Sequence, residues 1–263
     1  MLLAMDIGNT NVKIGIYKNS VLDSSWRLST ENTRTADEYG MVLYDLLLTR
    51  GVKFSDISGI IICSVAPSLN YTIEHMCDYY MARKPIFVDA QTKVGIKLNY
   101  KNLADLGADR IVESAAAYRF YGGPVIVIDF GSATTFNAVS GAGEFLGGAI
   151  APGIKTATES LVNTAAKLPR IELVKPEGII GLDTRTCMQS GIVYGYAGLV
   201  KYLVAKIREQ EDMQNAKVVA TGGLSELIVT VDETLIDVID RALALKGLKY
   251  IYELNDKFSS QNQ

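Results

Sequence analysis

An acid, a glycine and several hydroxyl or amide residues follow the first apolar stretch of the chain, in the run Asp6–Lys13 (DIGNTNVK). Gly8 permits a tight turn and a close approach of the backbone, so that successive N–H groups can face phosphate oxygens. Asp6 stands where the apolar stretch ends, and a carboxylate there can hold Mg²⁺ directly or through water. Asp, Gly and Asn are also common in ordinary hairpin turns, so a single copy of the pattern leaves both interpretations open.

The same pattern occurs a second time, in the run Asp129–Thr135 (DFGSATT) after the apolar stretch Val125–Ile128. Acid, glycine and hydroxyl residues stand in the same order as in the first copy. Two such loops on facing domains can bind a polyphosphate from both sides. The chain contains neither G-x-x-x-x-G-K-[ST] nor G-x-G-x-x-G, which excludes the P-loop and the dinucleotide-binding turn. A phosphate-binding pair of hairpins is therefore the prediction.

A third glycine pattern, Thr221-Gly222-Gly223, ends an apolar strand-like run before a predicted helix. Two glycines at such a junction let a purine or a ribose lie close to the backbone. The pattern gains meaning only together with the two hairpins, and with them it completes a set of elements suited to ATP.

Composition narrows the chemistry further. His75 is the only histidine, so a mechanism that needs a His base or several imidazole ligands is nearly excluded and a general base must be a carboxylate. The three cysteines, Cys63, Cys77 and Cys187, are odd in number and far apart, which argues against a disulfide framework or a zinc site and fits reduced thiols in the cytosol. The net charge of −3, without a basic stripe, gives no footprint for nucleic acid.

No apolar run reaches the ~18 residues that a membrane span needs, and the N-terminus lacks a basic leader. We therefore expect a cytoplasmic protein without a membrane partner, acting on a small molecule.

Hydrophobic periodicity predicts the elements that position these residues. In the first half the order is βββαβαβα. The helix after Thr35 opens with a capping-box pattern, in which Glu38 is the third residue after the cap. The predicted segments are Leu2–Met5, Asn11–Tyr17, Val21–Leu28, Thr35–Gly51, Gly59–Cys63, Ser68–Arg83, Pro85–Asp89 and Arg110–Tyr121.

The second half repeats this start, because Val125–Ser132 aligns with Leu2–Asn9. Strands Thr135–Val139 and Gly143–Ala151 follow, then helices through Glu211, a strand over Lys217–Ala220 and a largely helical stretch over Asp232–Asn255. The repeat predicts an internal duplication. The fold class is α/β, with two duplicated ribonuclease H-like or actin-like domains, mixed central sheets flanked by helices, and a nucleotide cleft between them. We expect the domains to be residues 1–121 and 122–263.

Taken together, these motifs resemble the superfamily of actin, sugar kinases and heat-shock chaperone ATPases, and within it the type III pantothenate kinases. The runs Asp6–Asn11, Gly107–Arg110 (GADR) and Asp129–Thr135 look like that family's first phosphate, pantothenate and second phosphate motifs. Gly147–Gly153 and Thr221–Gly223 also follow in family order, and the resemblance extends from Met1 to about Leu245. One departure is Ser132, where the family usually has Thr, and the hydroxyl is retained.

The resemblance implies a role for each matching position. Asp109 would be the catalytic base, although a carboxylate before a helix also fits an N-cap. Asp6 would organise Mg²⁺, and Asp129 would hold the monovalent cation, K⁺ or NH₄⁺. The other ATP or phosphate contacts would be Gly8, Asn9, Thr10, Asn11, Lys13, Gly131, Ser132, Gly222 and Gly223. The pantothenate contacts would be Tyr100, Gly107, Ala108, Asp109, Arg110 and Thr184.

The resemblance also implies a reaction and an assembly. ATP would be the phosphoryl donor, pantothenate the acceptor in the first step of coenzyme A biosynthesis, and the chain a homodimer in which Thr184 could act from the partner subunit. Two alternatives stay open at this point. One is another small-molecule kinase or a phosphatase on the same scaffold, and the other is a non-catalytic nucleotide-binding regulator.

Overall fold

The computed structural model describes residues 1–259, and within it the chain forms two compact units. Unit 1 contains Met1–Gly95, Lys101–Ala116 and the chain from Leu243 onward, whereas unit 2 contains Ile96–Tyr100 and Ala117–Ala242. The division expected from the sequence, after residue 121, differs from these units in three places. The structure puts Ile96–Tyr100 and residues 117–121 in unit 2, and the helix that begins at Leu243 in unit 1.

Unit 1 is built on a five-stranded sheet in the order β3-β2-β1-β4-β5. Strand β1 pairs antiparallel with β2 and parallel with β4, so the sheet is mixed. The strands are β1 (Leu2–Ile7), β2 (Asn11–Lys18), β3 (Val21–Ser29), β4 (Gly59–Ser64) and β5 (Ile86–Phe87).

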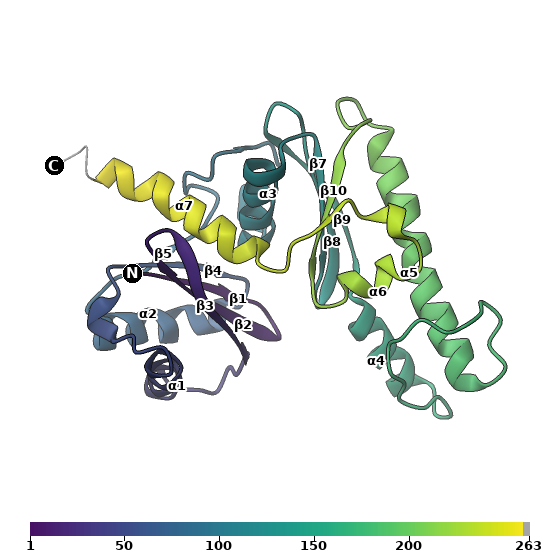
Figure 1. Ribbon diagram of the computed structural model, residues 1–263, viewed down its shortest axis with the longest axis horizontal. Coiled ribbons are helices and arrows are strands. Elements are labelled where there is room, and N and C mark those ends of the chain that lie inside the picture. The colour runs from purple at the N-terminus through teal and green to yellow at the C-terminus, as the bar shows by residue number, and fades with distance from the viewer. Residues whose placement is uncertain (260–263) are drawn as a thin grey trace. The chain divides into compact units, whose positions relative to one another are not determined.

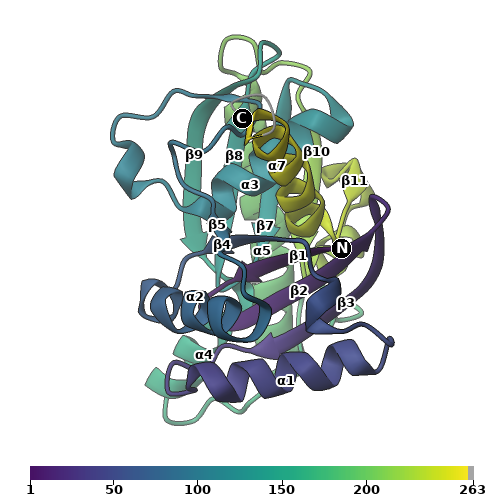
Figure 2. The same ribbon diagram turned by 90° about the vertical axis from the view of Figure 1, so that its left-hand side faces the viewer.

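Helices cover both faces of this sheet (Figure 2). One face carries α1 (Ala36–Leu48) and α2 (Pro67–Met81), and the other carries α7 (Leu243–Ser259). The predicted capping box of α1 is confirmed, because Glu38 N–H donates to the Thr35 hydroxyl and Thr35 N–H donates to the Glu38 carboxylate. Helix α3 (Ala108–Tyr121) starts in unit 1 and ends in unit 2. Short 3-10 turns lie at Phe54–Asp56 and Leu103–Asp105.

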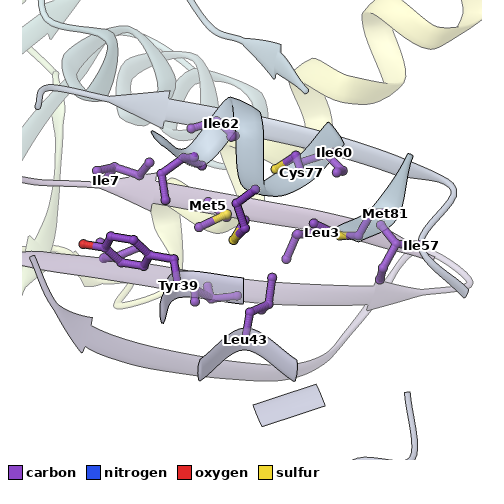
Figure 3. Packing of buried hydrophobic residues seen from close by; sticks show 14 of the residues in the cluster. Leu3, Met5, Ile7, Tyr39, Leu43, Ile57, Ile60, Ile62, Cys77 and Met81 are labelled. Carbon is purple, nitrogen blue, oxygen red and sulfur yellow. The ribbon is translucent and has the colours of Figure 1, made fainter. Parts of the chain in front are cut away.

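Successive residues of β1 alternate between two faces of the sheet, and this places the apolar core of unit 1 on one face and the candidate acid on the other. Leu3, Met5 and Ile7 point to the α1–α2 face, where they pack with residues such as Leu43 and Cys77 (Figure 3). The intervening residues of β1 must point to the opposite face. Asp6 is one of these, so the sheet carries its first candidate acid on the face that α1 and α2 leave uncovered.

Unit 2 is built on a six-stranded sheet in the order β11-β10-β7-β8-β9-β6. Its strands are β6 (Lys97–Leu98), β7 (Val125–Phe130), β8 (Ala133–Val139), β9 (Glu144–Pro152), β10 (Lys217–Gly222) and β11 (Val238–Ile239). Its helices are α4 (Ile154–Thr164), α5 (Thr184–Arg208) and α6 (Ser225–Val229), with a 3-10 turn at Glu233–Leu235. Helices α4, α5 and α6 lie on one side of this sheet (Figure 1). Their residues pack with Ile126 and Ile128 in a second core.

The two sheets confirm the internal duplication. The order β3-β2-β1-β4-β5 corresponds strand by strand to β9-β8-β7-β10-β11, and each corresponding pair runs in the same relative direction. Unit 2 adds only β6, which pairs parallel with the outer edge of β9. Asp6 and Asp129 therefore occupy equivalent positions, each one residue before the end of the central strand.

Two predictions of local structure were wrong in part. Apart from the 3-10 turn Glu233–Leu235, the stretch Asp232–Asn255 is helical only from Leu243, because Val238 and Ile239 extend the sheet beside β10 and so form β11. Strand β6 was missed, since a two-residue edge strand has no periodicity to detect. Within the described residues no helix is long and apolar enough to cross a membrane.

Candidate active site

The first predicted phosphate loop is the turn between β1 and β2. Gly8 N–H donates to the Asn11 carbonyl at 2.9 Å, and the Thr30 hydroxyl donates to the Gly8 carbonyl at 2.7 Å, so the turn is fixed from both sides. Asn9 and Thr10 are exposed at its tip. A Cβ on Gly8 would lie 3.1 Å from the Asn11 carbonyl oxygen, closer than an ordinary contact. The loop is therefore a tight, exposed turn that phosphate oxygens could approach.

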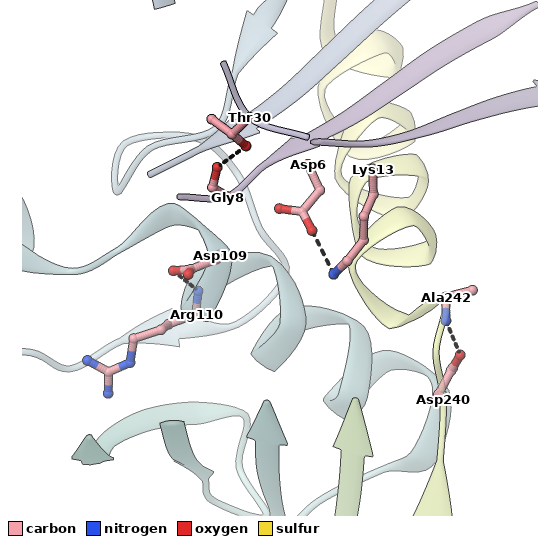
Figure 4. A network of polar contacts seen from close by, with 8 residues as sticks. All are labelled: Asp6, Gly8, Lys13, Thr30, Asp109, Arg110, Asp240 and Ala242. Carbon is pink, nitrogen blue, oxygen red and sulfur yellow. Dashed lines mark hydrogen bonds and ion pairs between the residues drawn. The ribbon is translucent and has the colours of Figure 1, made fainter. Parts of the chain in front are cut away.

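Asp6 lies at the base of this loop and is nearly buried, with 7% of its surface exposed. Its carboxylate accepts a hydrogen bond from the Lys13 ammonium at 3.0 Å (Figure 4). Lys13 is its register partner on β2, and Cys63 is its register partner on β4. Register partners on adjacent strands present their side chains on the same face, so Lys13 and Cys63 flank the Asp6 carboxylate.

Asp109 lies in the first turn of α3, and not at its N-cap. The Ile111 N–H donates to the Gly107 carbonyl, which makes Gly107 the capping residue and Asp109 the second residue of the helix. The Asp109 carboxylate accepts from the backbone N–H of Arg110 at 2.7 Å (Figure 4). A Cβ on Gly107 would lie 2.6 Å from Asp109 Oδ1, so the glycine of the motif leaves room for this carboxylate.

Asp109 is in an environment that suits a proton acceptor. Burial raises the pKa of Asp109 above its usual value, and the negative charge of Asp6 adds to the rise, whereas the Arg110 N–H partly opposes it. A carboxylate with a raised pKa is a stronger base than an exposed one. Arg110 itself is buried, with 6% of its surface exposed.

Two further residues of unit 1 were missed as site residues by the sequence analysis. Cys63 is fully buried, and burial raises the pKa of its thiol well above the usual value, with the carboxylates of Asp6, Asp109 and Glu113 adding to the effect. The thiol is therefore neutral. Glu113 is buried to 2% exposure on α3, and its only sequence signal is a charged residue within a largely apolar helix face.

The second predicted phosphate loop is the turn between β7 and β8. Gly131 N–H donates to the Ala133 carbonyl at 3.1 Å, and Ser132 is exposed at the tip. The Ser132 carbonyl accepts from Gly153 N–H at 3.1 Å and from the Thr156 hydroxyl at 2.8 Å. The start of α4 thus fixes this loop, as Thr30 fixes the first.

Asp129 lies between two glycines. A Cβ on Gly131 would be 2.9 Å from one carboxylate oxygen of Asp129, and a Cβ on Gly222 would be 2.7 Å from the other. Gly222 also has φ +92°, a conformation that side-chain-bearing residues rarely adopt. A side chain at either position would collide with the Asp129 carboxylate, so both positions require glycine. Gly223 follows in an exposed position before α6.

The register partners of Asp129 differ from those of Asp6. They are Thr135 on β8 and Thr221 on β10, so a hydroxyl stands where Lys13 stands in unit 1. Thr221 Oγ1 is buried and, among the described residues, has no hydrogen-bond partner. The register partner of Asp6 on β2 carries an ammonium group, whereas both register partners of Asp129 carry hydroxyl oxygen atoms, which are suitable ligands for a cation.

The remaining predicted substrate residues belong to unit 2. The Tyr100 ring packs on Phe145, with 5.9 Å between ring centroids, and lies next to Gly147. Thr184 is exposed as the first residue of α5, directly after the capping residue Asp183. The structure thus brings together Asp6, Lys13, Asp109 and Arg110 within unit 1, and separately Asp129, Gly131 and Gly222 within unit 2. Tyr100 and Thr184 also belong to unit 2, but they lie in other segments than Asp129, Gly131 and Gly222.

A comparison with protein families decides between the functions that the sequence left open. Residues 2–206 match the model of the type III pantothenate kinases. The chain belongs to the type III pantothenate kinase family. It is therefore a kinase that uses ATP to phosphorylate pantothenate in coenzyme A biosynthesis. The prediction of a small-molecule kinase is confirmed. The family match favours it over the two alternatives left open by the sequence, a phosphatase and a non-catalytic regulator.

Solved structures confirm the fold. A protein from Campylobacter jejuni, named as a conserved Baf family transcriptional activator, superposes with a TM-score of 0.61 at 21% identity, over 97% of this chain and 99% of that one. MreB 5 of Spiroplasma citri bound to AMPPNP superposes at 0.56 and 10% identity, over 99% and 98%. The ROK hexokinase of Thermus thermophilus superposes at 0.52 and 13% identity, over 97% and 99%. The chain therefore has the same actin-like fold as these three proteins.

The donor groups fit the metal that such a kinase uses with ATP. Among the described residues, no group of three or more His, Cys, Asp or Glu side chains could hold a metal ion. Mg²⁺ in kinases usually keeps waters and binds one or two carboxylates together with phosphate oxygens. Asp6 beside the first loop supplies one such carboxylate.

Proposed function

We propose that the residues at the two hairpin turns and at the start of α3 divide the kinase reaction among them. In this assignment Asp6 binds Mg²⁺, which neutralises charge on the triphosphate when it is bound. Gly8, Asn9, Thr10, Asn11 and Lys13 bind the phosphates from unit 1, and Gly131 and Ser132 bind them from unit 2. The tight turns and the exposed tips described above support these roles. Gly222 and Gly223 would lie against the adenosine.

Asp109 would act as the general base. Its carboxylate accepts the proton of the pantothenate hydroxyl while the hydroxyl oxygen bonds to the γ-phosphorus and the bond to the ADP oxygen breaks. Because phosphoryl transfer depends mainly on positioning and charge stabilisation, a carboxylate that orients the hydroxyl and takes its proton late is adequate. The raised pKa of Asp109, caused by burial, supports this role.

Arg110 would bind the carboxylate of pantothenate, since guanidinium and carboxylate groups match as donors and acceptors. The burial of Arg110 supports a role in which its guanidinium is held by the protein and is not free in solvent. Gly107 and Ala108 would complete this site through their backbone atoms. Tyr100 and Thr184 would also contact pantothenate.

Asp129 would hold a monovalent cation, K⁺ or NH₄⁺. The single observation that carries this assignment is the buried Thr221 hydroxyl oxygen on the strand beside Asp129, which has no protein partner among the described residues. A buried polar atom of this kind calls for a ligand, an ion or a water. A cation there would also offset the repulsion between Asp129 and the phosphates.

The working form would be a homodimer. Residues just before Thr184 carry exposed apolar side chains: Ile179 at 62%, Ile180 at 81% and Leu182 at 94% exposure. A contiguous apolar group of this kind marks a contact surface. The segment is held against α5, because the Cys187 thiol donates to the Gly181 carbonyl at 3.3 Å. We further propose a cytoplasmic location, which the three free cysteines support.

ADP release by the purified protein tests these roles. We expect turnover with pantothenate and none with a panel of sugars, and a sharp increase when Na⁺ is replaced by K⁺ or NH₄⁺. Asp129→Ala should remove the response to the cation while ATP-dependent thermal stabilisation persists in part. Equal rates in all three salts would contradict the cation assignment and leave the kinase assignment intact.

A further inference from the structure

Six aromatic rings form a continuous row on the outer surface of unit 1, away from the residues assigned to catalysis. Neighbouring centroids along the row are 5.8, 5.8, 5.0, 6.1 and 6.2 Å apart. We call this surface the aromatic row, and its members in order are Tyr44, Phe54, Tyr80, Tyr79, His75 and Tyr71.

The row runs over three elements that lie side by side in unit 1: α1, the turn Phe54–Asp56, and α2 (Figure 2). Its α2 part is ordered by the helix, because residues four apart share a face. The planes of His75 and Tyr79 differ by only 8°, and those of Tyr71 and His75 by 25°. The Tyr80 hydroxyl donates to Asp37 on α1 at 2.6 Å, which fixes the row where it passes between the helices.

The outer members of the row are open to solvent. Tyr71 is 78% exposed and Tyr79 is 71% exposed, and the α1 side adds Met41 at 53% and Leu48 at 58%. The core of unit 1 does not need these side chains, because α1 and α2 face it with other residues, such as Leu43 and Ile73. Exposed aromatic and apolar groups gathered on one face indicate a binding surface.

Helices α1 and α2, which carry five of the six rings, have charges of one sign, whereas the exposed Lys53 directly precedes Phe54. The charged side chains within α1 and α2 are carboxylates, all at exposed positions: Asp37, Glu38, Asp45, Glu74 and Asp78. Neither helix contains Lys or Arg, although the whole chain has 26 basic and 29 acidic residues. The nearest basic residues along α2, Arg83 and Lys84, follow its C-terminal end, roughly 18 Å from Tyr71 at the rise of a helix.

Aromatic faces and carboxylates together select one kind of partner. A planar guanidinium stacks on a tyrosine ring and at the same time donates hydrogen bonds to a carboxylate, whereas a lysine ammonium is a point charge that stacks poorly. Tyr71 and Tyr79 alternate with Glu74 and Asp78 along the exposed side of α2, which offers both contacts at helical spacing.

We propose that the aromatic row with its flanking carboxylates is a docking surface for an arginine-rich segment of another protein. The surface is separate from the residues assigned to phosphate and pantothenate binding, so a protein docked there can bring this kinase to a location or an assembly without entering its active site.

Calorimetric titration of the full chain with an oligoarginine peptide tests the proposal. We expect binding that weakens with salt and is tighter than binding of an oligolysine peptide of equal length. The double variant Tyr71→Ala/Tyr79→Ala should bind oligoarginine about fivefold to thirtyfold more weakly, as expected for two exposed cation–π contacts. Glu74→Lys should weaken binding as well.

Two control variants, on helices outside the aromatic row, test whether the loss of peptide binding is specific to this surface. Tyr202→Ala removes a tyrosine that is 63% exposed on α5, and Glu159→Lys reverses an exposed charge on α4, and neither should change binding. Pantothenate phosphorylation should be unchanged in every one of these variants. Equal affinity for oligoarginine and oligolysine, unaltered binding by the double tyrosine variant, or equal losses in the controls would each overturn the proposal. So would a change of oligomeric state in the double variant, because the face would then be a contact between copies of this chain.

Discussion

The Lys13 ammonium lies 3.0 Å from a carboxylate oxygen of Asp6, and the two residues oppose each other on β2 and β1. Lys13→Met leaves the nearly buried Asp6 carboxylate without this partner. We expect a loss of about 1–3 kcal/mol in the free energy of unfolding, the usual effect of an unsatisfied buried polar group. ATP should also bind more weakly. Urea denaturation and calorimetry measure both quantities.

The stabilisation of the protein by Mg²⁺ is a second measurable property that depends on the Asp6–Lys13 pair. Because the cation can replace the ammonium beside Asp6, it should restore more stability to Lys13→Met than to the wild type. Lys18→Met, at the exposed end of the same strand, is the control and should alter neither property. Unaltered ATP affinity and unaltered stability in Lys13→Met would show that the ion pair is incidental.

The substitution Asp109→Asn distinguishes a catalytic role of Asp109 as the general base from a purely structural role. The amide keeps the size of the carboxylate and can still accept from the Arg110 N–H, but it cannot take the proton of the pantothenate hydroxyl. A general base contributes roughly 10²–10⁴-fold to rate, so we expect a turnover number lower by about two orders of magnitude with ATP binding retained. Steady-state ADP release gives the rate, and normal turnover would rule out the base.

The stability of Asp109→Asn should depend on pH with a definite sign. The folded-state pKa of Asp109 is raised by burial, so the folded protein retains this proton where the unfolded chain, with a pKa near 3.8, has lost it. The ionised carboxylate therefore destabilises the fold as the pH rises from about 3.8 through the raised pKa. Asp109→Asn should be at least as stable as the wild type at neutral pH, and this advantage should vanish in acid. Thermal melts at several pH values measure this difference in stability. A variant that is less stable than the wild type only at neutral pH would contradict the predicted destabilisation by the ionised Asp109 carboxylate.

Gly222→Ala tests the space around Asp129. The new methyl group would lie 2.6 Å from the Phe130 carbonyl oxygen and 2.7 Å from Asp129, at a φ of +92°. Strain of this kind costs of order 1–3 kcal/mol, and moving the carboxylate should also reduce activation by K⁺. Gly195→Ala is the matched control, because the glycine is exposed in α5 with nothing within 4 Å of its Cβ position. That change should stabilise the protein by about 0.4–1 kcal/mol.

Leu182→Asp tests the proposed contact between subunits. Leu182 is 94% exposed, so a single chain has no need of its apolar side chain, whereas an apolar interface would lose it. We expect sedimentation to show a shift from dimer to monomer, together with a raised KM for pantothenate if Thr184 acts from the partner. Val21→Asp, at a similarly exposed position of β3, should leave the assembly unchanged. A Leu182→Asp protein that remains dimeric would place the interface elsewhere.

The duplication and the two hairpin turns could be predicted from the sequence because each depends on local order. An apolar strand, an acid and a glycine follow one another in both copies, and no distant contact is needed to recognise them. The position of Asp109 within the helix was predicted only approximately. An acid before an apolar helical run fits the cap or the first turn equally well, and the Gly107 carbonyl decides between them.

Long-range pairing accounts for what the sequence did not reveal. Cys63 joins the site because β4 pairs with β1 in a register that places it beside Asp6. Glu113 joins because α3 turns that face inward, and Tyr100 reaches unit 2 because β6 pairs with β9. None of these placements depends on neighbouring residues in the chain, so the local motifs did not show them.

The packing of α7 on the sheet of unit 1 constrains the order in which this chain can fold during synthesis. Gly15 on β2 lies against Leu245, a Cβ on Gly59 would collide with the Tyr252 ring, and Leu248 and Ile251 are fully buried. Strand β1 leaves the ribosome well before the helix that covers its far face, because that helix follows all of unit 2 in the chain. Unit 2, whose last residue is Ala242, can close before that helix exists. Until α7 has been translated, the nascent chain must therefore protect the uncovered face of β1 and β2, which carries Asp6 and Lys13, from pairing with other segments.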